Sequence, residues 1–193
     1  MWAVPRFRLV ADAVPVVPGR LRGNRPRRRR RGRPDLECAG GRPVSALDAI
    51  GRTYPKTAPY EVGREKIREF AEAIGDTNSA YLDAAAAQKL GHPDVIAPPT
   101  FPIIFTMRST RPAVFDPEIG MDYARVVHGE QRFVYTRPVR AGDRLVCETQ
   151  IEDVKLRAGS IFLSMRTDVT TEDGEPVLAA YALIVSRAAE KEG

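Results

Sequence analysis

The sequence predicts an α+β domain in which an antiparallel sheet wraps around a central apolar helix. Three observations support this fold class. Helical periodicity dominates up to about residue 107, strict alternation of apolar and polar residues takes over after residue 125, and one segment between them is apolar on nearly every side. We expect this single domain to cover residues 44–193, behind an Arg-rich leader of residues 1–43.

The leader holds 12 of the 30 Lys and Arg residues, five of them in the run Arg27 to Arg31, but only 3 of the 25 Asp and Glu residues. Its richness in Pro, Gly and Arg predicts disorder. It has three interpretations: an arm for nucleic acid or anionic membranes, a targeting peptide, or an artefact of the start site, with translation beginning near Val44. We favour the artefact because the composition changes abruptly at that point.

The remaining 150 residues carry 18 basic and 22 acidic side chains, so the domain is mildly acidic and we do not expect it to bind nucleic acid. No apolar run approaches the roughly 18 residues that span a bilayer, and we expect a cytoplasmic protein without a membrane partner. Cys38 and Cys147 lie far apart and show no metal-ligand spacing, so no metal site is predicted.

Two helices are predicted in the first half of the domain. Residues Arg64 to Ile74 carry apolar side chains at helical spacing, and Gly75 is suited to end that helix. Asp83 can cap a second helix that ends at Gly91. The apolar positions of the first helix are Ile67, Phe70, Ala71 and Ile74.

The segment VIAPPTFPIIFTM predicts the central helix. Pro98 and Pro99 suit its N-terminal turn, and Pro102 is tolerable only in the first helical turn. Because the segment is apolar on nearly every side, we expect the helix to be buried on all sides.

From Arg125 onward the period is two, which predicts a meander of about four antiparallel strands. Turns are expected at Ala141–Asp143, Arg157–Ser160 and Glu172–Gly174. A sheet wrapped around an apolar helix is a hot-dog arrangement. The alternating positions are Leu145, Cys147, Thr149 and Ile151, then Ile161, Leu163, Met165, Thr167 and Val169, and finally Val177, Ala179, Tyr181, Leu183 and Val185.

The loop after the first helix carries a motif. Gly75, Asp76 and Asn78 resemble the G-D-x-N-P-x-H signature of MaoC-like hot-dog dehydratases, and RFVYTRPVRAGDRL (residues 132–145) resembles that family's second segment. PYEVGREKIREFA is most similar to the A-type (HadA-like) subunits of (3R)-hydroxyacyl-ACP dehydratases. The resemblance covers nearly all of residues 46–189.

This resemblance implies reversible loss of water from a 3-hydroxyacyl thioester. In the family an Asp and a His hold and deprotonate the water, while a helix N-terminus polarises the thioester carbonyl. Asp76 occupies the Asp position, but Tyr81 stands where the His should be, and Ser79 replaces the motif's Pro. A phenol titrates near 10 and an imidazole near 6.5, so Tyr81 is a poor base at neutral pH.

The candidate catalytic residues are therefore Asp76 and Tyr81, with His128 as a substitute base. Each has a structural alternative: a local turn for Asp76, a partly buried aromatic for Tyr81, and the start of a strand for His128. The second histidine, His92, is expected in a solvated loop. The expected substrate-binding residues are Asn78, Pro99, Thr100, Phe101 and Phe105. Residues 98–100 either present backbone N–H groups to the thioester or simply begin a helix. Phe101 and Phe105 are expected to be core residues in the first place and to line the acyl-chain site in the second.

The resemblance implies that the A-type subunit provides an acyl channel and that its B-type partner provides the catalytic pair. We therefore predict a subunit of a (3R)-hydroxyacyl-thioester dehydratase in fatty-acid elongation, acting on acyl-ACP or acyl-CoA without a cofactor, in a heterodimer with a B-type hot-dog subunit or in a homodimer. The alternatives are a self-sufficient enoyl-thioester hydratase and a non-enzymatic acyl-thioester-binding protein. Arg132, Arg137 and Arg140 are candidates for docking the carrier, or an ordinary solvated strand face.

Overall fold

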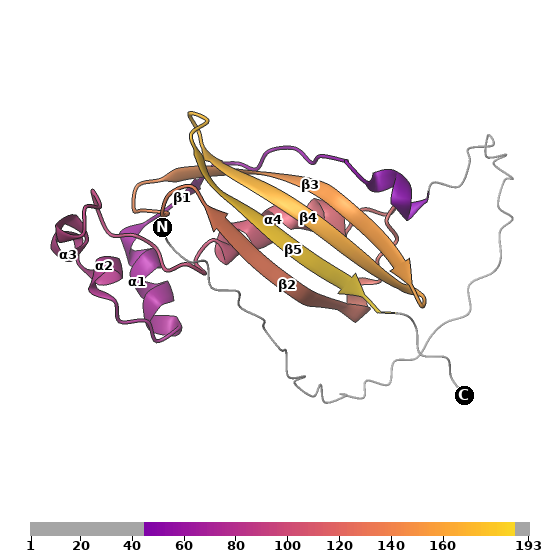
Figure 1. Ribbon diagram of the computed structural model, residues 1–193, viewed down its shortest axis with the longest axis horizontal. Coiled ribbons are helices and arrows are strands. Elements are labelled where there is room, and N and C mark those ends of the chain that lie inside the picture. The colour runs from indigo at the N-terminus through magenta and orange to yellow at the C-terminus, as the bar shows by residue number, and fades with distance from the viewer. Residues whose placement is uncertain (1–44, 188–193) are drawn as a thin grey trace, which may run out of the picture.

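The computed structural model describes residues 45–187 (Figure 1). The expectations for the leader fall outside the described residues. The elements in chain order are η1 (Ala46–Ala49), β1 (Tyr60–Glu61), α1 (Arg64–Ala73), α2 (Ser79–Leu82), α3 (Ala84–Lys89), α4 (Ile103–Val114), η2 (Tyr123–Arg125), β2 (Val126–Tyr135), β3 (Arg144–Arg157), β4 (Ser160–Thr171) and β5 (Pro176–Ser186).

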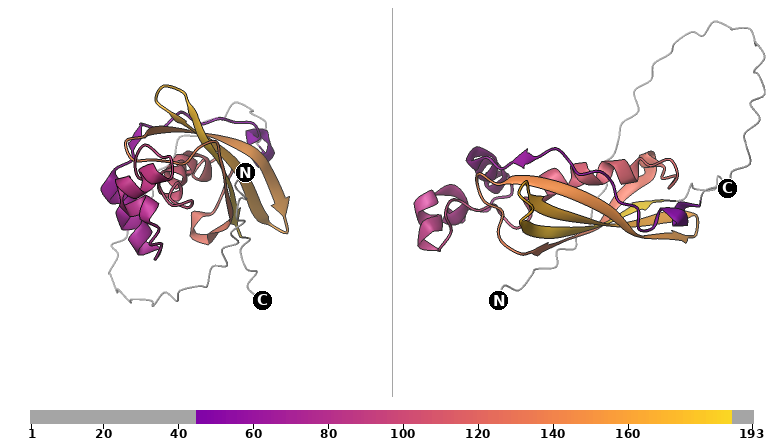
Figure 2. Two further views of the ribbon diagram at one scale, coloured as in Figure 1. Left: turned by 60° about the vertical axis from the view of Figure 1, so that its left-hand side comes forward. Right: turned by 90° about the horizontal axis from the view of Figure 1, so that it is seen from above.

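The two predicted helices α1 and α3 are confirmed together with their ends. Ile67 and Ala71 of α1 are buried, whereas Ile74 is the C-cap and is exposed. Gly75 ends α1 with φ of +71°, a left-handed conformation that favours glycine. Asp83 caps α3 by accepting a hydrogen bond from the backbone N–H of Ala85. With α2, these helices gather at one end of the sheet (Figures 1 and 2).

The four predicted long strands are present, but their order corrects the expected meander. The sheet runs β1-β3-β4-β5-β2, and all its pairs are antiparallel. Only β3, β4 and β5 follow one another as a meander, because the chain crosses from β2 at one edge to β3 near the other edge. Within the described chain, β2 therefore has a neighbouring strand on one side only.

The central helix α4 packs against one face of the curled sheet (Figure 2). The prediction that it is buried on all sides is wrong. Phe105, Thr106 and Ser109 face the sheet, but Met107 is 51% exposed and Arg108 is also exposed. The sheet of one chain covers a single face of the helix, and the apolar run ends at Met107. Pro102 occupies the N-cap, so it costs no helical hydrogen bond.

The core between α4 and the sheet has two apolar regions separated by a polar layer. One region includes Phe105 and Cys147, and the other includes Ala113 and Ile151. Midway between these positions lie three buried hydroxyl side chains, which are Ser109 on α4, Thr149 on β3 and Thr167 on β4. The Thr149 and Thr167 oxygens are 2.9 Å apart, and Thr149 is 3.1 Å from Ser109 Oγ. Hydrogen bonding satisfies these groups inside the core.

The described residues contain no helix with the length and apolarity needed to cross a membrane.

Candidate active site

The motif loop between α1 and α2 is held by its own side chains. Asp76 Oδ1 accepts a hydrogen bond from the backbone N–H of Asn78 at 3.2 Å. Asn78 Oδ1 in turn accepts from the backbone N–H of Ala80 at 3.0 Å and caps α2. Asp76 therefore performs the local turn role that the sequence left as an alternative to chemistry, and Asn78, predicted to bind substrate, serves as a helix cap.

Tyr81 lies where the family signature has its histidine, and it is a core residue. It is 8% exposed and belongs to the apolar cluster that contains Phe101 and Phe105. Burial raises the pKa of the Tyr81 phenol above its ordinary value, and the charge of Asp76 raises it further. At neutral pH the side chain is a neutral phenol that can donate a hydrogen bond but cannot act as a base.

A second phenol, which the sequence analysis did not single out, lies at this end of the sheet. Tyr135 is the last residue of β2, and its hydroxyl donates to the carbonyl oxygen of Pro99 at 2.8 Å. Burial raises the pKa of Tyr135, and the neighbouring Tyr81 raises it further. The aromatic strand RFVY was visible in the sequence, but only the fold brings its last residue next to the turn before α4.

The turn before α4 differs from the expected helix N-terminus. Pro99 and Thr100 precede the helix, which begins at Ile103, and Pro99 has no N–H to present to a thioester. Phe101 and Phe105 are almost completely buried, and their ring centroids are 6.4 Å apart. These two rings pack in the core, which is the first of the two roles expected for them, the second being to line the acyl-chain site.

His128 does not join Asp76. It lies on β2 seven residues from Tyr135, which is roughly 20 Å along a strand. Its Nε2 is 3.1 Å from the carbonyl oxygen of Glu130. Within residues 45–187, neither histidine hydrogen-bonds to an Asp or Glu side chain, so neither forms an Asp–His pair of the kind in the family signature.

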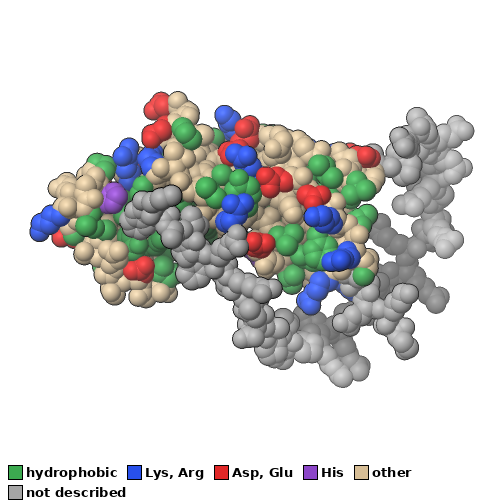
Figure 3. All heavy atoms as spheres, in the orientation of Figure 1, with side chains coloured by type: hydrophobic (Ala, Val, Ile, Leu, Met, Phe, Trp, Pro, Cys, Tyr) green, Lys and Arg blue, Asp and Glu red, His purple; other side chains and the backbone are tan. Residues whose placement is uncertain are grey.

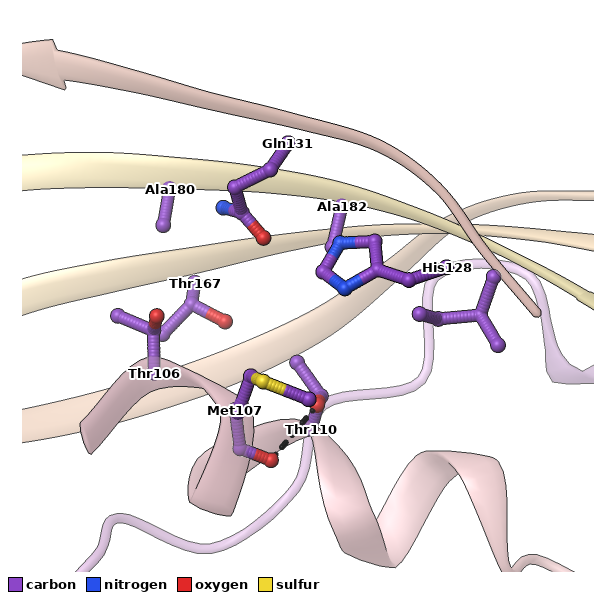
Figure 4. Close-up of a pocket in the computed structure, with 9 residues that line it drawn as sticks. Thr106, Met107, Thr110, His128, Gln131, Thr167, Ala180 and Ala182 are labelled. Carbon is purple, nitrogen blue, oxygen red and sulfur yellow. Dashed lines mark hydrogen bonds between the residues drawn. The ribbon is translucent and has the colours of Figure 1, made fainter. Parts of the chain in front are cut away.

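His128 instead lines a small cavity between α4 and the sheet (Figure 4). The cavity has a volume of about 20 Å³ and lies beside the edge strand β2. Gln131 points from β2 into the same space, and its Nε2 is buried without a hydrogen-bond partner. The period-two pattern placed this residue in a strand but gave no reason to select it.

The three arginines proposed for carrier docking each make contacts within the chain. The Arg132 guanidinium lies 3.8 Å from the ring centroid of Tyr181 on the outer face of the sheet. Arg137 forms ion pairs at 2.8 Å with both Asp143 and Glu175, and Arg140 approaches Asp143 at 3.5 Å. On the face drawn in Figure 3, basic and acidic side chains are interspersed and form no continuous basic surface.

Across residues 45–187, no cluster of three or more His, Cys, Asp or Glu side chains is arranged to hold a metal ion. The chemistry available at the motif loop is hydrogen-bond donation by the Tyr81 phenol beside the Asp76 carboxylate, because the single proton of the Tyr135 hydroxyl is already donated to Pro99.

Comparison with known families decides the classification. A model of the family described as FAS1-like, dehydratase domain region matches residues 48–180. The chain belongs to this family of FAS1-like dehydratase regions. It is 58% identical over 148 residues to a UPF0336 protein of Streptomyces coelicolor, covering 76% of this chain and 99% of that relative. A UPF0336 protein of Saccharopolyspora erythraea is 53% identical over 138 residues, or 72% of this chain and 88% of the relative.

Solved structures place this FAS1-like dehydratase region among MaoC-like hot-dog dehydratases. It is similar to a "MaoC-like dehydratase" with a TM-score of 0.70 and 32% identity, matching 76% of this chain but only 44% of the length of that protein. It is also similar to a chain of the HadBC (3R-hydroxyacyl-ACP dehydratase) complex of Mycobacterium tuberculosis, with a TM-score of 0.64 and 33% identity over 72% of this chain and 98% of that one. The predicted α+β hot-dog fold is confirmed.

Proposed function

We propose that this chain is the acyl-chain-holding subunit of a heteromeric (3R)-hydroxyacyl-thioester dehydratase. A second hot-dog subunit carries the Asp and His that transfer protons. The reaction is the reversible loss of water from a 3-hydroxyacyl chain on acyl carrier protein or CoA, during fatty-acid elongation in the cytoplasm.

The observation that carries this proposal is Tyr81. Hydration of an enoyl thioester requires a base that takes a proton from water, and general bases work best when their pKa is near the operating pH. A buried phenol with a raised pKa fails this requirement. No histidine among residues 45–187 hydrogen-bonds to the neighbouring Asp76, whose carboxylate already accepts a turn hydrogen bond.

The edge strand β2 supports a partner that is itself a hot-dog subunit. Nine of its ten residues are paired with β5 along one side, with Gly129 left out at a bulge. The other side presents backbone groups of the kind that template pairing with another strand. Val134 on this strand is an exposed apolar side chain. The similarity to a chain of the HadBC complex favours a second, different hot-dog chain as the partner.

Co-expression with a hot-dog protein that has an intact G-D-x-N-P-x-H motif tests the proposal. We expect the two chains to co-purify and to hydrate crotonyl-CoA together, while the purified single chain shows no turnover. Val134→Lys should abolish co-purification because a lysine on an edge strand disfavours pairing. Leu156→Lys is the matched control, since Leu156 is also an exposed apolar residue but lies on β3 away from that edge.

Other results would support the alternatives. Robust turnover by the isolated chain would replace the proposal with a self-sufficient hydratase. Tight binding of acyl thioesters without turnover, alone or with any such partner, would favour a non-enzymatic binding protein.

A further inference from the structure

The cavity between α4 and the sheet has a more polar lining than an acyl-binding channel would need. Its polar side chains are Thr106 and Thr110 from α4, Thr167 from β4, and Gln131 with His128 from β2. Figure 4 shows these side chains converging from the helix and the sheet on one space. A channel that serves only methylene groups would be lined by apolar side chains, because an unpaired buried polar group is costly.

The hydroxyl protons of the three threonines are already used. Thr106 donates to the carbonyl oxygen of Pro102 at 2.8 Å, and Thr110 donates to that of Met107 at 3.0 Å. Each of these hydroxyls has one proton and two lone pairs, so each has acceptor capacity left after its proton is used.

The hydroxyl proton of Thr167 is also used, because it belongs to a chain of hydrogen-bonded hydroxyls. Ser109 donates to the carbonyl oxygen of Thr106, so the Thr149 hydroxyl donates to Ser109 Oγ at 3.1 Å. The remaining bond, between Thr149 and Thr167 at 2.9 Å, then takes its proton from Thr167. The third threonine therefore also has only acceptor capacity to offer the cavity.

Gln131 supplies the complementary donor. Its Nε2 is the buried side-chain atom that has no partner within the described chain. One donor opposite several acceptors, in a space of about 20 Å³, matches the hydrogen bonding and the size of a single water molecule. Such a water accepts from Gln131 and donates to threonine oxygens.

We propose that Gln131 is a specificity-determining residue that limits the acyl group to a short chain by holding this water. The inference rests on the proposed function, because the cavity lies beside the edge at which the partner would pair. Met107, half exposed on α4, lies at its margin. A short acyl chain stops before the water. A long chain displaces the water and leaves the Gln131 amide facing methylene groups.

The test uses the complex of this chain with its catalytic partner and compares kcat/KM for crotonyl-CoA and dodecenoyl-CoA. We expect the wild-type complex to favour crotonyl-CoA by about tenfold or more, which is the scale of leaving one buried donor unpaired. Gln131→Met keeps the length of the side chain and removes the amide, so it should raise the dodecenoyl-to-crotonyl ratio about tenfold. Thr167→Val, a nearly isosteric change, should shift the ratio in the same direction even if Gln131→Met fails to assemble.

Gln150→Met is the matched control. Gln150 is exposed on β3, where its Nε2 donates to the carbonyl oxygen of Gly51, and its substitution should leave the ratio unchanged. A complex that hydrates both substrates equally, with a ratio insensitive to Gln131→Met and Thr167→Val, overturns the specificity role and leaves the proposed function standing. A complex that hydrates neither substrate overturns the proposed function, and the specificity role with it.

Discussion

Replacing Tyr81 by Phe in the assembled complex separates packing from chemistry at the motif loop. The substitution removes one hydroxyl and keeps the ring that packs near Phe101. At pH 7 a phenol with an ordinary pKa near 10 is ionised in about one molecule in a thousand. Burial raises the pKa of Tyr81, so the ionised fraction is smaller still. Relative to an imidazole that is half deprotonated, forming the phenolate at pH 7 costs about 4 kcal/mol or more.

We therefore expect kcat/KM for crotonyl-CoA to change by less than about threefold in Tyr81→Phe. The free energy of unfolding should fall by about 1 kcal/mol, the scale of one lost hydrogen bond. A residue that transfers protons in the rate-limiting step contributes about 10² to 10⁴ in rate. The passive and the catalytic role of Tyr81 thus predict changes in kcat/KM that differ by at least an order of magnitude.

Tyr135→Phe is the matched control, since it makes the same change to the neighbouring phenol. It removes the hydrogen bond to the Pro99 carbonyl and should lower stability by about 1 kcal/mol. The assay is the loss of enoyl absorbance with purified complex, alongside urea unfolding of each variant. A hundredfold loss of kcat/KM in Tyr81→Phe, with normal assembly and stability, would refute the passive role of this residue.

Three further predictions concern stability. Asp83→Ala removes the cap of α3 and should lower the free energy of unfolding by about 1 kcal/mol in urea melts, and an unchanged melt would mean that the cap contributes nothing. Burial opposes ionisation of Asp116, but the hydrogen bond from Tyr54 and other donors hold its pKa below the ordinary value. Its contribution is present above about pH 4 and is lost as the pH falls, so Asp116→Asn should destabilise at pH 7 and flatten the acid limb of the stability profile. Burial raises the pKa of Cys147 to about 12, so in a Cys38→Ser variant a thiol reagent at pH 8 should react with Cys147 only after unfolding. The stability that the neutral thiol contributes should decline as the pH rises above about 8.5. Rapid labelling of the folded protein would contradict the first expectation.

Local structure was the most predictable part of the fold. Short stretches of sequence determine the helical spacing of α1, the glycine end at Gly75 and the Asp83 cap of α3. The structure has each of these features. The alternation in β3 also identified the buried face, because Leu145, Cys147 and Ile151 are all core residues.

The order of the strands, and the side of each strand that faces the core, were harder to predict. Alternation identifies a strand but does not say which strand pairs with it. In β5 both alternating sets are largely apolar. Leu178, Ala180 and Ile184 are core residues, and of the set that includes Tyr181 only Val177 is buried. The position of β2 beside β5 depends on a crossover that no local pattern encodes. The roles of Tyr135 and Gln131 depend on this placement, so neither was accessible from the sequence.

The loss of the motif histidine also predicts what restoring it would do. In Tyr81→His the new imidazole would enter an apolar pocket, where burial disfavours its charged form. Asp76 Oδ1 would still accept from the Asn78 backbone, and Ser79 would still stand in place of the motif's proline. We therefore expect the isolated Tyr81→His chain to hydrate crotonyl-CoA barely above background. Robust turnover by this single variant would mean that the loop already holds its carboxylate in a productive position, and that the missing imidazole alone separates this chain from an enzyme.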